Sequence, residues 1–334
     1  MTLQTKIIFF MIMGLAAALV GGVLLVEKVG GFTLPTRGGV QVDIQVAAPP
    51  SLEGWVREAA AEFNSRNPQT TVQVVSLKGL EANQKLSLGG GEALPEAWIA
   101  EADFIRQMAQ GLPYEAQGPS VAQTRLIWLA MRERAGLQGL LDWETVHAAA
   151  VDRARWEALS GGDFQFDVAL PSPGNSVEGL AAYLSAAADF RDQPDLRNSP
   201  VTDQAFLDWM AEILEAAPER SRSPLDQLAR PPVSVDVGLV LESELGQLDL
   251  AKFMQQPPQY NVIFNYPYLI RRDAPLEDAA AREEAAQRFR DFLLSPEQQQ
   301  KLAQAGFSPA DATGLGEGVQ VDGATAAILW NRVK

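Results

Sequence analysis

The stretch that decides the fold covers residues 166–190 and reads FDVALPSPGNSVEGLAAYLSAAADF. Its apolar start, residues 168–170, suits a buried strand, and the Pro and Gly residues of 171–175 then interrupt any regular structure. Apolar residues return at the i, i+3, i+4, i+7 spacing that predicts an amphipathic helix: Leu180, Tyr183, Leu184 and Ala187. The sequence therefore predicts a strand, a short polar loop and a helix.

Asn175 and Ser176 stand where this helix is expected to begin, and both are favourable N-cap residues. A strand that ends in a small polar loop over a helix N-terminus leaves backbone N–H groups that can bind a polar ligand. The alternative is that Ser176 only caps its own helix. This stretch alone leaves both interpretations open.

The N-terminal half contains a second unit of the same kind. Residues 40–47 alternate like a half-buried strand, Pro49 and Pro50 end that strand, and a helix follows with Ser51 as its expected N-cap. A further strand at 71–77 completes a β-α-β start, which implies parallel strands and a right-handed crossover. Residues 97–100 predict a third strand ending on the same side as Ser51. Later, 233–237 and 259–270 each predict a strand, and Ser295 is expected to open a helix with a capping box.

Composition excludes several classes of function. The 334 residues are enough for two lobes with separate cores, and the net charge of -15 argues against binding nucleic acid. The chain has no cysteine and one histidine, His147, which we place on a helix surface. These counts exclude disulfides, thiol nucleophiles, Cys/His zinc sites, a lipid-modified cysteine and any Ser-His-Asp triad not built on His147. We expect no cofactor.

The N-terminus predicts a membrane anchor. Residues 7–26 are uncharged and mostly apolar, and as a helix they would span roughly the 30 Å hydrocarbon core. Secretory signals have shorter apolar regions, so an uncleaved signal-anchor is favoured over a cleaved signal. Either way the bulk of the chain lies outside the cytoplasm, and residues 27–39 form a linker.

Five segments, in this order, resemble bacterial extracytoplasmic solute-binding proteins of the two-lobed type II kind, over about residues 40–312. They are VDIQVAAPPSLEGWVREAAAEFNSRNP, EALPEAWIAEADF, DWETVHAAA, FDVALPSPGNSVEGLAAYLSAA and NYPYLIRRDAP with its continuation to SPEQQQKLAQAGFSP. The resemblance implies an α/β, two-lobed, type II periplasmic-binding-protein-like fold, here preceded by one N-terminal transmembrane helix. Two crossing strands, near 123–131 and 260–266, would join the lobes. Lobe 1 would comprise 40–122 and 265–334, lobe 2 would comprise 123–264, and 1–39 would be anchor and linker.

The resemblance also implies that ligand binds between the lobes. The positions that correspond to the family's cleft are Ser51, Trp98, Ala100, Asn175, Ser176 and Tyr266. Trp98 and Tyr266 could instead be core aromatics, and the two serines could be caps alone. Asp236 and Glu242 could approach the cleft from the second lobe, although Asp236 reads as a solvent-facing strand residue. Glu101, Asp103 and Glu242 could bind a cation or an amine, or be ordinary solvated acids.

The function implied is capture of a small polar solute for ABC-type import by a membrane-tethered monomer with a permease as partner. A sensing or scaffold module of the cell envelope, without transport, is the alternative. A serine hydrolase based on Ser176 is disfavoured, because Glu178 stands where the nucleophile elbow needs glycine. We therefore expect no enzyme activity.

Overall fold

The computed structural model describes residues 41–88, 94–133, 141–152, 154, 156–157, 165–217, 222–229, 235–273 and 278–334. The predicted N-terminal membrane helix lies outside these ranges. Within them, no helix combines the length and the apolar character needed to cross a membrane. Residues Val42–Lys334 form one compact unit.

The first sheet has the strand order β2-β1-β3-β10-β4. Its strands are β1 (Val42–Ala48), β2 (Thr70–Ser76), β3 (Ala97–Ile99), β4 (Tyr114–Ala116) and β10 (Tyr268–Arg271). β1 pairs in parallel with β2 and β3, as the β-α-β pattern predicts, whereas β10 runs antiparallel between β3 and β4. This sheet therefore combines two segments of chain that are far apart in sequence.

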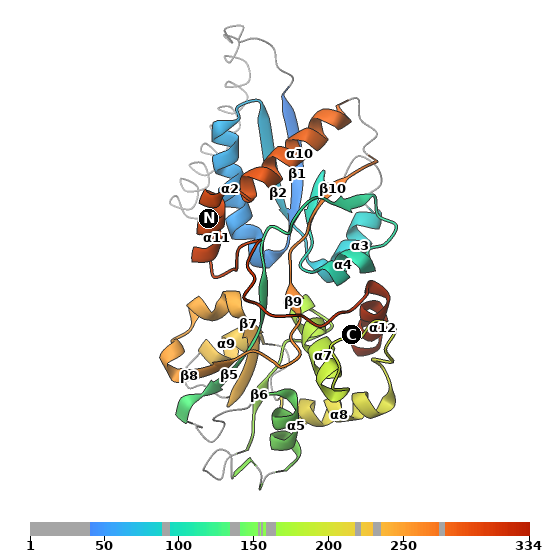
Figure 1. The fold of residues 1–334 in the computed structure, drawn as a ribbon, viewed down its shortest axis with the longest axis vertical. Helices are drawn as coiled ribbons and strands as arrows, with labels where there is room; N and C mark the ends of the chain where they lie inside the picture. Colours follow the sequence, from blue (N-terminus) through green and yellow to red (C-terminus); the bar gives the residue numbers. More distant parts are fainter. Residues whose placement is uncertain are drawn as a thin grey trace, which may run out of the picture. The chain divides into compact units, whose positions relative to one another are not determined.

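Helices cover the first sheet and form the first lobe with it. They are α2 (Pro50–Arg66), α3 (Gly79–Leu88), α4 (Asp103–Met108), α10 (Ala279–Leu293) and α11 (Pro296–Gln304). α2 presents an apolar stripe at helical spacing, and its Phe63 ring packs edge-on against Phe289 and Phe292, with centroids 5.3 and 5.5 Å away. Figure 1 shows α2 and α10 beside the strands β1 and β2.

The second sheet has the order β6-β7-β5-β8, and β9 pairs with β5 beyond this path. These strands are β5 (Thr124–Met131), β6 (Val168–Ala169), β7 (Val237–Leu241), β8 (Phe253–Gln256) and β9 (Ile263–Phe264). The second lobe adds α5 (Trp143–Val151), α7 (Val177–Phe190), α8 (Gln204–Glu215), α9 (Pro224–Ala229) and the 3₁₀ turns η3 (Glu242–Gln247) and η4 (Leu250–Lys252). α7 is buried along most of its length because small Ala and Ser residues let neighbours pack closely.

The chain passes between the lobes at residues 117–123 and 265–267, and these two passages lie side by side. The Val121 N–H donates to the Tyr266 carbonyl over 3.1 Å, and Thr124 pairs with Phe264. A third passage, at 305–322, was not predicted. It bonds to the second lobe, where the Val319 N–H donates to Asn261, before α12 (Gly323–Val333) packs against α4 and α7.

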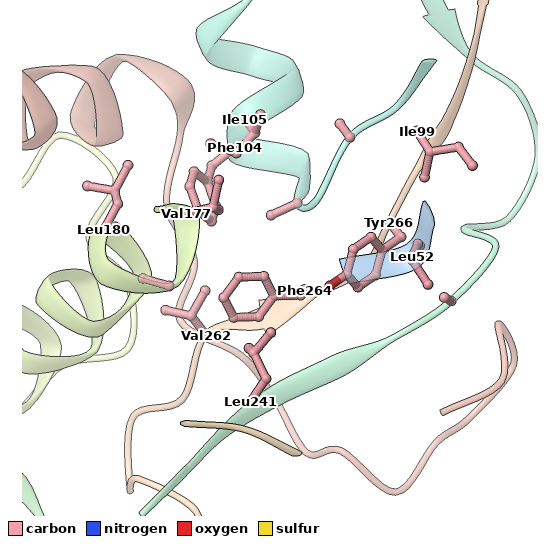
Figure 2. Packing of buried hydrophobic residues seen from close by; sticks show 14 of the residues in the cluster. Leu52, Ile99, Phe104, Ile105, Val177, Leu180, Leu241, Val262, Phe264 and Tyr266 are labelled. Carbon is pink, nitrogen blue, oxygen red and sulfur yellow. The ribbon is translucent and has the colours of Figure 1, made fainter. Parts of the chain in front are cut away.

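The core continues from one lobe into the other. A single cluster of buried apolar residues includes α4 of the first lobe and α7 of the second. Figure 2 shows Phe104 and Ile105 of α4 beside Val177 of α7, with Phe264 and Tyr266 close to them. The lobes are therefore held against each other by apolar contact as well as by the connecting strands.

Several sequence predictions need correction. The expected single strand at 259–270 is two strands, because Tyr266 has a positive φ of 28° and Pro267 offers no N–H to a ladder. The strand expected at 233–237 begins at Val237 instead, and part of the predicted range lies outside the described residues. β4, β8, α9 and α12 were not predicted.

One predicted N-cap, Ser51, is wrong, and the capping box predicted at Ser295 is missing. α2 begins after Pro49, which makes no side-chain cap, so Ser51 lies within the first turn rather than at the N-cap. α11 begins after Ser295 as expected, but its side chain makes no capping bond. Proline at the first turn accounts for both starts, because its fixed φ suits the helix and it has no N–H to satisfy.

Candidate functional site

The loop before α7 is folded tightly onto the first turn of that helix. Ser176 is the N-cap, as predicted, and its hydroxyl accepts from the Gly179 N–H over 3.0 Å and donates to the Ser172 carbonyl over 3.3 Å. A Cβ on Gly179 would lie 2.2 Å from that carbonyl carbon and oxygen, so only glycine fits there. The arrangement presents Asn175 to solvent at the start of the helix.

Ser51 and Tyr266 meet on the first-lobe side. The two hydroxyl oxygens lie 3.2 Å apart, and the Tyr266 side chain is fully buried. Burial raises the pKa of Tyr266 well above its usual value, and the hydrogen bond with Ser51 offsets only part of that rise. Tyr266 is therefore a neutral phenol that orients the Ser51 hydroxyl.

A cavity of about 420 Å³ lies between the lobes. Its walls come from the first turns of α2 and α3, from the loop and first turn of α7, and from α12. The residues that line it include Ser51, Lys78, Gly79, Glu101, Asn175, Ser176, Glu178 and Trp330. Three helix N-termini thus converge on one space that is large enough for a small solute.

A second cavity of about 270 Å³ adjoins the first, because Asn175, Ser176 and Glu178 line both. It extends into the second lobe between α9 and the end of β7, where Glu244 and Arg222 line it. The α7 N-terminus therefore separates two compartments of one polar cleft.

The cleft is acidic. Glu101, directly after β3, is 5% exposed, and its Oε2 atom has no hydrogen-bond partner among the described residues. Burial raises the pKa of Glu101 well above its usual value, the charge of Glu178 raises it further, and the Gly79 backbone N–H offsets part of the effect. Burial, with the charge of Glu178, raises the pKa of Glu244 to about 7, against the hydrogen bond from the Leu241 N–H.

The structure brings together four of the six residues that the sequence predicted for the site. Ser51, Asn175 and Ser176 line the main cavity, whereas Tyr266 lines neither cavity but lies within hydrogen-bond distance of Ser51. Trp98 and Ala100 line neither cavity. Trp98 is 1% exposed and packs edge-on against Tyr114, and the Ala100 N–H donates to the Pro267 carbonyl. A ligand-binding role for all six stays a prediction.

Other predicted polar residues have structural partners. Asp236 is buried rather than solvent-facing, and its carboxylate accepts from the Asp167 N–H over 3.0 Å. Glu242 forms a two-point ion pair with Arg125, at 3.0 and 3.1 Å.

His147 also has a structural place. It stacks on Trp209, and its Nε2 lies 2.6 Å from Glu212 Oε2. These partners account for His147 on α5 without a triad.

The cavity residues that sequence reasoning missed include Glu178, Glu244 and Trp330. In the sequence, Glu178 counts only as a mismatch to a hydrolase motif. However, an acid two residues after the N-cap Ser176 lies in the first turn of the helix, next to the same loop. Among the described residues, no group of three or more His, Asp or Glu side chains could hold a metal ion.

Comparison with known proteins agrees with this architecture. The family model of the bacterial extracellular solute-binding proteins matches residues 44–308. No curated protein gives a significant match to the chain.

Solved structures share the fold at low identity. The sulfate-binding protein SubI from Mycobacterium tuberculosis H37Rv is 17% identical, with a TM-score of 0.56 over 87% of this chain and 98% of that one. Iron-bound HitA from Pseudomonas aeruginosa is 13% identical, with a TM-score of 0.59 over 87% and 99%. Maltose-bound MalE3 from T. maritima is 13% identical, with a TM-score of 0.58 over 80% and 81%.

The ligands named for these structures differ from one another, so the likeness concerns the fold and not the solute. The family match covers most of the two-lobed part of the chain, including every element that lines the cleft except α12. The chain belongs to the family of bacterial extracellular solute-binding proteins.

Proposed function

We propose that this protein captures a small polar solute in the cleft between its lobes and delivers it to an ABC-type permease, while residues 7–26 tether it to the membrane. The observation that carries the proposal is the convergence of the α2, α3 and α7 first turns on one cavity of about 420 Å³. Structural neighbours described as binding proteins for sulfate, iron and maltose support the same use of the fold.

The expected mechanism is closure of the lobes around the solute. Polar groups of the cleft would replace the water around the ligand, and the paired passages at 117–123 and 265–267 would serve as the hinge. The apolar cluster that includes residues of both α4 and α7 favours lobes that approach each other. The ligand stabilises the closed form to the extent that it binds the closed form more tightly than the open form.

A thermal-shift screen of the full chain against sugars, amino acids, oxyanions and amines tests the proposal. A solute at 100 times its dissociation constant adds about 2.7 kcal/mol, which raises the melting temperature by a few degrees. Asn175→Trp should abolish this shift, because Asn175 is exposed and lines both cavities. Glu58→Trp is the matched control, because it places the same side chain at an exposed position outside both cavities and should leave the shift unchanged.

Retention of the full ligand shift in Asn175→Trp would contradict the cleft assignment. Delivery and tethering need separate measurements. Deleting the gene should abolish uptake of the solute that the screen identifies, and the full chain should sediment with membranes. Normal uptake in the deletion strain would favour the sensing or scaffold alternative.

A further inference from the structure

The most unusual group in the cleft is the carboxyl of Glu101. It is almost completely buried, one of its oxygens has no partner among the described residues, and it lines the main cavity. An unpaired buried carboxyl oxygen destabilises the fold, so a ligand that donated to Glu101 would offset this cost. A Cβ on Gly79 would lie 1.8 Å from this oxygen, so glycine gives the carboxyl room at the cavity wall.

Glu101 is not an isolated acid. Glu178 comes from the first turn of α7 and Glu244 from η3, and these three carboxyls interact electrostatically with Tyr266. Among the described residues, Glu81 is the further acid on the cavity walls, and Lys78 and Arg222 are the bases. The elements around the cleft therefore contribute more acidic than basic residues, and Glu101 lies among them.

The helix N-termini compensate this charge only in part, because many of their N–H groups are already used. In α2, Pro50 has no N–H, and the N–H groups of Leu52 and Glu53 donate to the Pro49 carbonyl. In α7, the Gly179 N–H donates to Ser176, and in α3 the Gly79 N–H interacts with Glu101 itself. An anionic ligand would have to compete with a carboxylate for the N-terminus of α3.

We infer that the solute carries a primary ammonium group, which binds between Glu101 and Glu178. The inference rests on the proposed function and names the chemical class of its solute. An ammonium group offers three N–H donors, so it can hydrogen-bond to the carboxyl groups of Glu101 and Glu178 together. A metal ion is disfavoured, since the described residues include no cluster of three ligating side chains.

The inference predicts the direction of a pH effect. An ammonium ion favours the ionised form of each carboxyl, so its binding should expel protons that Glu101 and Glu244 hold in the empty cleft. Affinity should then rise as the pH increases toward about 7, the pKa of Glu244, by up to about tenfold per pH unit for each proton released. An anion that accepted a hydrogen bond from a protonated carboxyl would show the opposite slope.

Titration calorimetry on the full chain tests this with matched probes. Ethylamine, ethanolamine, 1,4-diaminobutane and 1,5-diaminopentane would be compared with their hydroxyl analogues and with succinate and sulfate. We expect amines to bind, hydroxyl analogues and anions not to bind, and two buffers of different ionisation enthalpy to reveal proton release at pH 7. Glu101→Gln keeps the side-chain shape and should weaken amine binding by roughly 30-fold or more.

Controls separate charge from folding. Glu58→Gln makes the same charge change at an exposed position of α2 outside both cavities, and it should leave amine affinity unchanged. Glu178→Gln should weaken amine binding even if Glu101→Gln fails to fold. Full amine affinity in either cavity variant, or affinity that falls with pH, would overturn the inference.

The panel also distinguishes this inference from the proposed function. Binding of a sugar or an anion, lost in Asn175→Trp, would overturn the ammonium assignment and leave solute capture intact. Failure of every amine, sugar and anion would count against both.

Discussion

At the residue scale, the cleft combines groups that are stable only in this environment. Ser51 and Ser176 have different roles although both were predicted as caps: Ser176 caps α7, whereas Ser51 is oriented by a buried tyrosine. Glu101 and Glu244 hold protons at pH values where an exposed glutamate is ionised. The cleft of the empty protein is therefore less charged than its composition suggests.

Glu244→Gln should alter how stability depends on pH. The pKa of Glu244 is about 7 in the folded protein and near 4.5 when unfolded, so its contribution is fully present below pH 4.5 and is lost as pH rises through 7. The variant should gain up to about 3 kcal/mol relative to the parent between pH 4.5 and 8.5, less to the extent that water reaches the side chain. Urea unfolding at the two pH values measures this, with Glu58→Gln as the control. An equal difference at both values would contradict it.

At the element scale, the site depends on the loops that connect strands to the helices that follow them. The units β1–α2 and β6–α7 each end a strand in a Pro-containing loop, and both place a helix N-terminus at the cleft. The two loops differ in how they are held. Prolines set the start of α2, whereas the loop before α7 needs close backbone packing against Gly179.

Gly179→Ala should destabilise the protein, because the new methyl group would overlap the Ser172 carbonyl and push the loop away from α7. We expect a loss of about 1–3 kcal/mol together with weaker solute binding. Gly54→Ala is the matched control, because Gly54 lies in helix α2 with open space around it and should gain about 0.5–1 kcal/mol. Urea unfolding of both variants gives the comparison. If the free energy of unfolding of Gly179→Ala equalled that of the parent, the prediction would be wrong, because the loop would have moved to accommodate the methyl group.

At the scale of the whole molecule, net charge and connectivity matter most. A net charge of -15 opposes the compact state and attracts cations toward the cleft. Three passages of chain join the lobes. Helix α12 packs against α4 of the first lobe and against α7 of the second. Lobe movement therefore has to carry α12 with one lobe or shear it against the other.

Salt should stabilise the protein at pH 8. The Debye length falls to about 10 Å at 0.1 M salt, which screens repulsion among the excess carboxylates. Raising sodium chloride from 20 to 200 mM should increase the melting temperature by a few degrees, and the effect should vanish near the isoelectric point of about 4.6. Differential scanning calorimetry at both pH values checks this. A melting temperature that falls with salt at pH 8 would indicate that attractive ion pairs outweigh the net repulsion.

The sequence indicated much of the site's backbone and little of its electrostatics. Ser176 could be found because a cap precedes an apolar periodicity, and Asn175 because it precedes the cap. Tyr266 was found through the resemblance, but its role was hidden, since the left-handed backbone there breaks what reads as one strand. Tryptophan is a residue type that can stack on a ligand, but Trp98 is buried against Tyr114 and belongs to the core.

By itself, then, the sequence determined the fold class, the parallel start of the first sheet and the family, because local periodicity, prolines and caps encode these within short segments. Only the tertiary structure decided which acids face the cleft. Glu101, Glu178 and Glu244 come from the loop after β3, from α7 and from η3, and no local pattern distinguishes them from solvated glutamates in so acidic a chain. The physical reason is that a pKa depends on burial and on neighbouring charges, and both arise from contacts between residues far apart in sequence.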